Sequence, residues 1–166
     1  MKTLFISLSL MCLTTTAWAE SQPFWPQTAP RIGNLYLKQE YWNYMKEAAQ
    51  RYQISPYLIQ AVCAIESRFD PDATSGRGRC YGLMQLDRGT AKVYGVDAHN
   101  PKENIMGGAA VIARLMKKYH GDIRKVLHVY NATCTPSYER EVIRAYNQAR
   151  LVEAQVSFLP SGGPNN

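Results

Sequence analysis

Long hydrophobic runs are nearly absent from this 166-residue chain. One apolar stretch occupies residues 4–13, which is too short to span a bilayer, and no later segment stays apolar for the roughly 18 residues that a membrane-spanning helix needs. We therefore expect no membrane anchor. Internal repeats and low-complexity segments are also lacking, and charged residues make up 19% of a chain that is 46% hydrophobic. This composition argues against disordered and collagen-like classes and fits one globular domain.

Cysteine is scarce, with four residues in the chain. The first lies within residues 1–19, so Cys63, Cys80 and Cys134 remain in the rest of the chain. They show no C-x-x-C spacing, and the three histidines do not cluster with them, so we predict no structural metal and no cofactor. In an oxidising compartment, three cysteines allow one disulfide and leave one thiol.

The N-terminal segment has the order of features found in a secretory signal. Lys2 precedes the apolar stretch 4–13, and Ala17-Trp18-Ala19 has the small-x-small pattern of a cleavage site before Glu20. We predict that residues 1–19 are removed and that the exported chain carries a net charge of +5. A positive charge favours anionic partners such as nucleic acid, membranes or wall polymers. Because the basic residues are scattered, a nucleic-acid-binding role is disfavoured.

Helical periodicity dominates the remaining sequence, and no set of alternating strands is evident. We predict a mainly α fold with an extended leader at 20–34, one domain at 35–158 and a disordered tail at 159–166. Residues 70–81 are interpreted as a loop, residues 82–86 as a turn or helix start, and Gly107-Gly108 as a place where another helix approaches closely. The expected helices cover 35–53, 56–69, 90–96, 104–119, 123–131 and 139–156.

Glu66 is the residue whose position suggests chemistry. It lies near the end of a hydrophobic helix and is followed by a glycine-rich loop. Burial there would raise its pKa and let the carboxylic acid donate a proton at neutral pH. On this pattern alone the ordinary interpretation, a solvated or ion-paired carboxylate, is favoured.

Further motifs follow in a fixed order. Ile65-Glu66-Ser67-x-Phe69-x-Pro71 leads to Ala73-x-Ser75, then Gly82-Leu83-Met84-Gln85-Leu86, Asn104-Ile105, Tyr119-x-Gly121-Asp122 and Tyr130-Asn131-Ala132. Together they resemble the soluble lytic transglycosylase family and its goose-type lysozyme relatives, over about residues 54–142. The resemblance implies a lysozyme-like single domain with a cleft that binds the glycan strands of peptidoglycan.

The resemblance also implies roles for individual residues. Glu66 takes the place of the family's single catalytic acid and base, which breaks the bond between N-acetylmuramic acid and N-acetylglucosamine and forms a 1,6-anhydro ring. Ser75 and Gln85 would bind substrate, and Met84 would line the floor of the cleft. Tyr130 would stand near Glu66 and orient it or the substrate's acetamido group.

Two departures from the family pattern concern the rim of the cleft. One extra residue separates Ser75 from Gly82, in a segment that carries Arg77, Arg79 and Cys80. The closing helix, which begins near Thr135-x-x-Tyr138, lacks the loop that usually precedes it, which implies a more open cleft. Because the two motifs beside them line one cleft in the family, Cys80 and Cys134 are expected to form the disulfide.

Two alternatives stay open from the sequence. Asp87 either caps the following helix or acts as a second carboxylate, in which case the chain would be a goose-type muramidase that hydrolyses the same bond. The other alternative is a chain that binds peptidoglycan without catalysis, as an assembly protein. Its small size and signal favour a monomeric enzyme in the periplasm of a Gram-negative bacterium that opens the wall for a secretion, conjugation or pilus machine.

Overall fold

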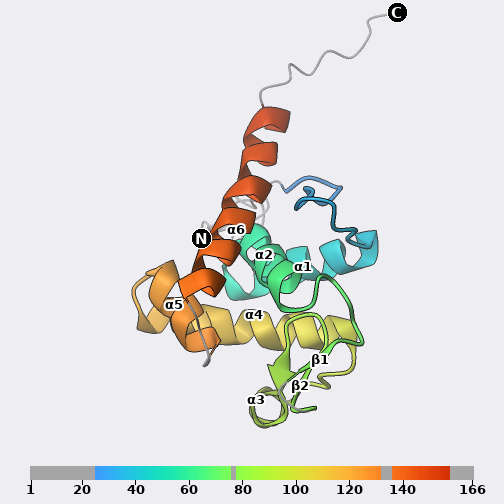
Figure 1. Cartoon of the computed structure of the whole chain (residues 1–166), viewed down its shortest axis with the longest axis vertical. Coiled ribbons are helices and arrows are strands. Elements are labelled where there is room, and N and C mark those ends of the chain that lie inside the picture. The colour runs from blue at the N-terminus through green and yellow to red at the C-terminus, as the bar shows by residue number, and fades with distance from the viewer. Residues whose placement is uncertain (1–24, 76–77, 132–135, 158–166) are drawn as a thin grey trace, which may run out of the picture.

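The computed structural model describes residues 25–75, 78–131 and 136–157, with side chains described up to residue 151. The predicted signal segment 1–19 and the predicted tail 159–166 lie outside these ranges. Within them the fold is mainly helical, as predicted (Figure 1). The helices are α1 Gln39–Tyr52, α2 Pro56–Glu66, α3 Arg88–Tyr94, α4 Pro101–Lys118, α5 Ile123–Tyr130 and α6 Pro136–Ser157. No helix in this part of the chain is long and apolar enough to cross a membrane.

Helix α2 forms the centre of the core. It begins with Pro56, whose fixed φ suits the first helical position, and every residue from 56 to 64 is buried. A helix that is apolar on all sides must be surrounded, and α2 packs against α1, α4 and α6. Figure 1 shows α4 crossing the molecule, with α5 at one end and with the small sheet and α3 below it.

A small sheet lies where the sequence predicted a loop. Strands β1 Thr74–Ser75, β2 Cys80–Tyr81 and β3 Leu86–Asp87 pair antiparallel in the order β1-β2-β3. The loop interpretation of 70–81 was wrong in this respect, because strands of two residues are too short to show an alternating pattern. The register places Cys80 opposite Ser75 on one side and Asp87 on the other.

The segment before α1 is extended and packs on the helical core. The prediction that this helix begins at residue 35 was wrong, since α1 begins at Gln39. The carbonyl oxygen of Pro26 accepts a 2.9 Å hydrogen bond from Trp42 Nε1, and that of Pro30 accepts one of 2.5 Å from Gln60 Nε2. These contacts hold the chain against α1 and α2 in a non-helical conformation.

The glycine pair in α4 admits a loop and not a helix. A Cβ added at Gly108 would lie 2.4 Å from Met84 Sδ, and one added at Gly107 would lie 2.8 Å from Leu86 Cδ1. The prediction that a helix approaches α4 closely at this glycine pair was therefore wrong, because the segment that approaches is a loop. The glycines let the Gly82–Leu86 segment approach α4, and that segment carries several residues of the candidate site.

Candidate active site

A cavity of about 660 Å³ opens between the end of α2, the small sheet, α4 and α5. It gathers Glu66, Ser75, Gln85, Tyr130 and Asp87, which the sequence analysis singled out from four separate motifs. The remaining lining residues are Arg79, Cys80, Leu86, Thr90, Val111, Val129 and Asn131. The clustering agrees with a single site.

Glu66 is the last residue of α2 and is half-buried at the cavity. Its Oε1 accepts a 2.6 Å hydrogen bond from the hydroxyl of Tyr138. Burial raises the pKa of Glu66 above that of a free glutamate, and the hydrogen bond from Tyr138 partly opposes this rise. The carboxyl group therefore keeps its proton to higher pH than an exposed glutamate, as a general acid requires.

Tyr138 is the functional residue to which the sequence analysis gave no role. It lies on α6, 72 residues beyond Glu66, and is 8% exposed. α2 and α6 pack closely against each other, which brings this hydroxyl to the end of α2. The only sequence signal was its place four residues before Val142, which puts both buried side chains on one face of the closing helix.

The turn between β2 and β3 is fixed by Asn104, a fully buried residue of α4. Asn104 Oδ1 accepts a 2.8 Å hydrogen bond from the main-chain N–H of Met84. Its Nδ2 donates to the carbonyl oxygens of Tyr81 at 2.7 Å and Ala98 at 2.8 Å. One side chain thus satisfies three buried main-chain groups and holds the turn that presents Gln85.

Gln85 and Ser75 form a polar wall of the cavity. Gln85 has φ +47°, and its Nε2 donates 2.9 Å hydrogen bonds to the carbonyl oxygens of Ala73 and Gly82. Its Oε1 accepts a 2.5 Å hydrogen bond from Ser75 Oγ. The two side chains predicted to bind substrate are therefore held by each other and by the main chain, which orients them in advance.

Tyr130 lines the cavity, but its hydroxyl donates to the carbonyl oxygen of Met84 at 2.9 Å. Burial, and then the charge of Glu66, raise the pKa of Tyr130 well above its ordinary value, so the phenol stays protonated. The hydrogen bond to Glu66 comes from Tyr138, while Tyr130 holds the Gly82–Leu86 segment in place.

Met84 does not line the cavity. Its side chain is fully buried and packs against Gly108 of α4. The prediction that Met84 contacts substrate at the cleft floor is therefore corrected, because a side chain without exposed surface supports the site from within the core.

Asp87 caps α3. Its side chain accepts a 2.8 Å hydrogen bond from the N–H of Gly89, which satisfies one of the unpaired donors at the start of the helix. This is the first of the two roles that the sequence left open. Asp87 also lines the cavity, so its position is compatible with the second role, that of a second catalytic carboxylate.

The two described cysteines, Cys63 and Cys80, form no disulfide with each other. Cys63 is buried in α2, which raises its pKa, whereas Cys80 is part of the cavity wall. Cys134 lies outside the described residues, so the predicted disulfide with Cys80 stays a prediction.

Comparison with known proteins identifies the family. The transglycosylase SLT domain family matches residues 43–151, which include every helix that surrounds the cavity. The chain belongs to the SLT transglycosylase domain family. Glu66, Tyr130 and Tyr138 all lie inside the matched region of this SLT domain.

Individual relatives agree with this assignment. The chain is 35% identical over 117 residues to a transglycosylase of Enterobacteria phage PRD1, covering 65% of this chain and 43% of that protein. It is 37% identical over 86 residues to membrane-bound lytic murein transglycosylase F 1 of Alkalilimnicola ehrlichii, covering 51% and 17%. The SLT domain therefore spans less than half the length of these relatives.

A solved structure shows the same fold. An inactive Glu-to-Gln mutant of the lytic transglycosylase Slt from Pseudomonas aeruginosa superposes with a TM-score of 0.57 at 20% identity, covering 69% of this chain and 24% of that one. At this identity the likeness shows the fold alone.

Proposed function

We propose that this SLT domain protein is a peptidoglycan lytic transglycosylase with Glu66 as its single catalytic acid and base. The observation that carries the proposal is the environment of Glu66, which is half-buried at the cavity, has a raised pKa and accepts a hydrogen bond from Tyr138. A carboxyl group in this environment is suited to give a proton and to take one back. The relatives that are named as murein transglycosylases support the same substrate and reaction.

The proposed reaction has two steps and consumes no water. Glu66 first donates its proton to the glycosidic oxygen between the muramoyl and glucosaminyl units as the bond from that oxygen to muramoyl C1 breaks. The acetamido oxygen of the same muramoyl unit forms a bond to C1. The Glu66 carboxylate then takes the proton of the muramoyl C6 hydroxyl, whose oxygen displaces the acetamido oxygen from C1. The product is a 1,6-anhydromuramoyl end, and Glu66 is again protonated.

The surrounding residues fit this cycle. The hydrogen bond from Tyr138 stabilises the Glu66 carboxylate between the two steps, because a donor favours the charged form. The polar wall of Ser75 and Gln85 is placed to hold the sugar's polar groups. Asn131 also lines the cavity, near Tyr130.

The second candidate is a muramidase in which Asp87 positions a water for hydrolysis. The position of Asp87 on the cavity wall favours this alternative, but its side chain already caps α3. We favour the transglycosylase because a single acid and base suffices when the substrate supplies both the acetamido group and the final nucleophile.

The proposal includes a biological setting for this reaction. The N-terminal signal pattern favours export to the periplasm of a Gram-negative bacterium, with the wall as the site of action. A role for a monomer that opens the wall for a secretion, conjugation or pilus machine is part of the same hypothesis. A Cys80–Cys134 disulfide would tie the cavity wall to the segment before α6, and peptide mapping without reduction tests for it.

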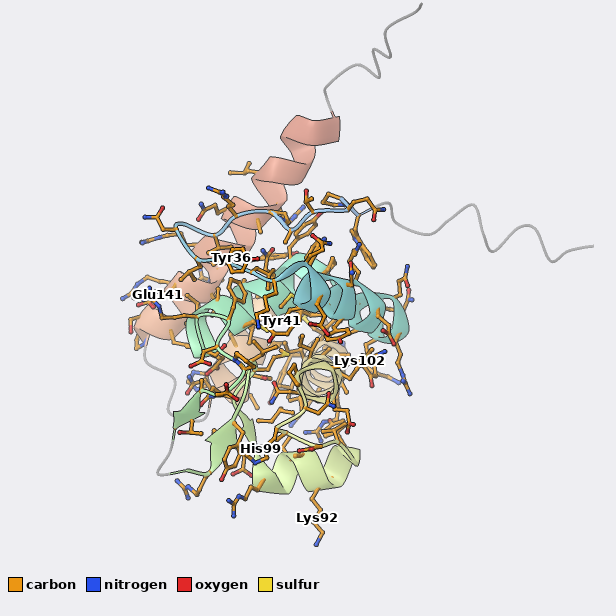
Figure 2. All side chains as sticks on the ribbon, turned by 90° about the vertical axis from the view of Figure 1, so that its right-hand side faces the viewer. Tyr36, Tyr41, Lys92, His99, Lys102 and Glu141 are labelled. Carbon is orange, nitrogen blue, oxygen red and sulfur yellow. The ribbon has the colours of Figure 1, made fainter. Side chains whose placement is uncertain are left out.

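The experiment that tests the function compares Glu66→Gln with a matched control, Glu141→Gln. Glu141 is exposed on α6, and Figure 2 shows it at the outer edge of the molecule. We expect the parent protein and Glu141→Gln to release soluble muropeptides from purified sacculi, and Glu66→Gln to release none above background. Full activity of Glu66→Gln would overturn the assignment of Glu66.

A further inference from the structure

Arg79 is the only cation among the described residues that line the cavity. The other charged groups there are the carboxyl groups of Glu66 and Asp87. Arg79 lies between Ser75 and Gly82, in the segment for which the sequence analysis expects one residue more than the family pattern. The proposed reaction at Glu66 does not use its charge.

The backbone around Arg79 is held on both sides. Its N–H donates a 3.1 Å hydrogen bond to the carbonyl oxygen of Ser75, and its own carbonyl oxygen accepts one of 3.2 Å from the N–H of Arg88. Burial and the charge of Asp87 raise the pKa of the Cys80 thiol, and the positive charge of Arg79 partly offsets this, as expected for a guanidinium close to that wall. The side chain itself is exposed, so a ligand entering the cavity can reach it.

Arg88, the next cation along this surface, contacts Tyr81. Its guanidinium lies over the ring of Tyr81, and its Nε donates a 3.0 Å hydrogen bond to the Tyr81 hydroxyl. It does not line the cavity. Among the described cations, Arg79 is therefore the one that lines the cavity.

The chemistry of peptidoglycan limits what this cation can recognise. The sugar rings of the strand are neutral, and its carboxylates sit on the lactyl arm of each muramoyl unit. They belong to the stem peptide where the peptide is present, or to the lactyl group where it has been removed. A guanidinium presents a planar fork of N–H donors that matches a carboxylate.

We propose that Arg79 binds a carboxylate on the lactyl-peptide arm of the muramoyl unit and makes the enzyme selective for strands that carry this charge. The proposal rests on the proposed function. Arg79 thereby acts as a specificity-determining residue, and the cleavage chemistry stays with Glu66. Because the pair forms at a partly open cavity, we expect it to change kcat/KM by about three- to tenfold.

The test measures kcat/KM of Arg79→Gln and Arg79→Lys on three forms of the same glycan strands. The first form carries native peptides, the second has all carboxylates converted to amides by carbodiimide coupling, and the third has its peptides removed by an amidase. Lys92→Gln is the matched control, because it removes one positive charge from α3 at a side chain that points away from the body of the molecule (Figure 2).

We expect the parent protein to cleave native strands about three- to tenfold faster than amidated ones. Arg79→Gln should lose this preference for native strands, with a lower kcat/KM on native strands and the parent's kcat/KM on amidated ones. Arg79→Lys should keep part of the preference, and Lys92→Gln should keep all of it. A loss on native strands assigns the bound carboxylate to the peptide, and a loss that also appears on peptide-free strands shows that Arg79 also binds the lactyl carboxylate that the amidase exposes.

Equal losses of Arg79→Gln on native and amidated strands, no loss at all, or an equal loss in Lys92→Gln would each overturn the inference while the proposed function stands. A parent protein that cleaves none of the three substrates would instead overturn the proposed function.

Discussion

The hydrogen bond between Tyr138 and Glu66 gives the sharpest prediction about catalysis. Tyr138→Phe removes one hydroxyl and leaves the ring that packs between α6 and α2. The lost bond is a 2.6 Å contact between the phenol and Oε1 of the carboxyl group. It favours the ionised form of Glu66, so its removal should raise the pKa of Glu66 further above its ordinary value.

The magnitude follows from the strength of such bonds. A hydrogen bond to a charged group contributes about 1.5–3 kcal/mol, and about 1.4 kcal/mol corresponds to a factor of ten. The carboxylate of Glu66 should therefore be disfavoured by about tenfold or more in Tyr138→Phe. The first step, in which Glu66 gives up its proton and becomes a carboxylate, should slow by up to about the same factor.

Two measurements check this. The pH profile of kcat/KM on sacculi should fall at high pH as the acid Glu66 ionises, and in Tyr138→Phe this fall should move to higher pH while the maximum rate drops. Carbon NMR of the Glu66 carboxyl group should report the same direction. The control is Tyr146→Phe, which makes the same change two turns further along α6, beside Arg150.

An unchanged or lowered pKa of Glu66 in Tyr138→Phe would refute the reasoning, whatever the rate. A rate loss without a change in the pH profile would mean that Tyr138 acts only through packing.

The remaining predictions concern stability and the second carboxylate. Glu66→Gln should raise the free energy of unfolding at pH 8, because the ionised carboxylate is unfavourable in the fold, and the gain should vanish below ~4.3, the pKa of an unfolded glutamate, as urea denaturation at both pH values would show. Gly108→Ala should destabilise by about 1–3 kcal/mol in the same assay, since its Cβ would meet Met84 Sδ at 2.4 Å, and an unchanged stability would contradict the packing described. Asn104→Ala should cost about 3 kcal/mol, because three buried main-chain groups lose their partner, which thermal unfolding would detect. Asp87→Asn should keep most of the lytic activity on sacculi, since an amide oxygen still caps α3, and a loss of a hundredfold or more would favour hydrolysis.

Local patterns in the sequence were sufficient for most of the helices. Pro56 after Ser55 marks the start of α2, and the apolar run that follows it predicts a buried helix. Its end was predicted at residue 69, whereas α2 ends at Glu66. The resemblance to the family predicted that Ser75, Gln85 and Tyr130 share one site, because several motifs in the family's order indicate the family's fold.

Features that depend on tertiary contacts were missed. Tyr138 reaches Glu66 only because α6 packs on α2, and no pattern within either helix contains that information. The strands of two residues exist through pairing with their neighbours. The glycines of α4 indicated a close approach correctly, but whether a helix or a loop approaches is decided by Asn104, which draws the Met84 turn onto α4.

The measurement that tests the central claim most directly is mass spectrometry of muropeptides released from sacculi in water enriched in oxygen-18. The account predicts 1,6-anhydromuramoyl ends that contain no heavy oxygen, resist borohydride reduction and disappear in Glu66→Gln. Reducible muramic ends that carry one heavy oxygen would contradict it, because they require water to attack C1.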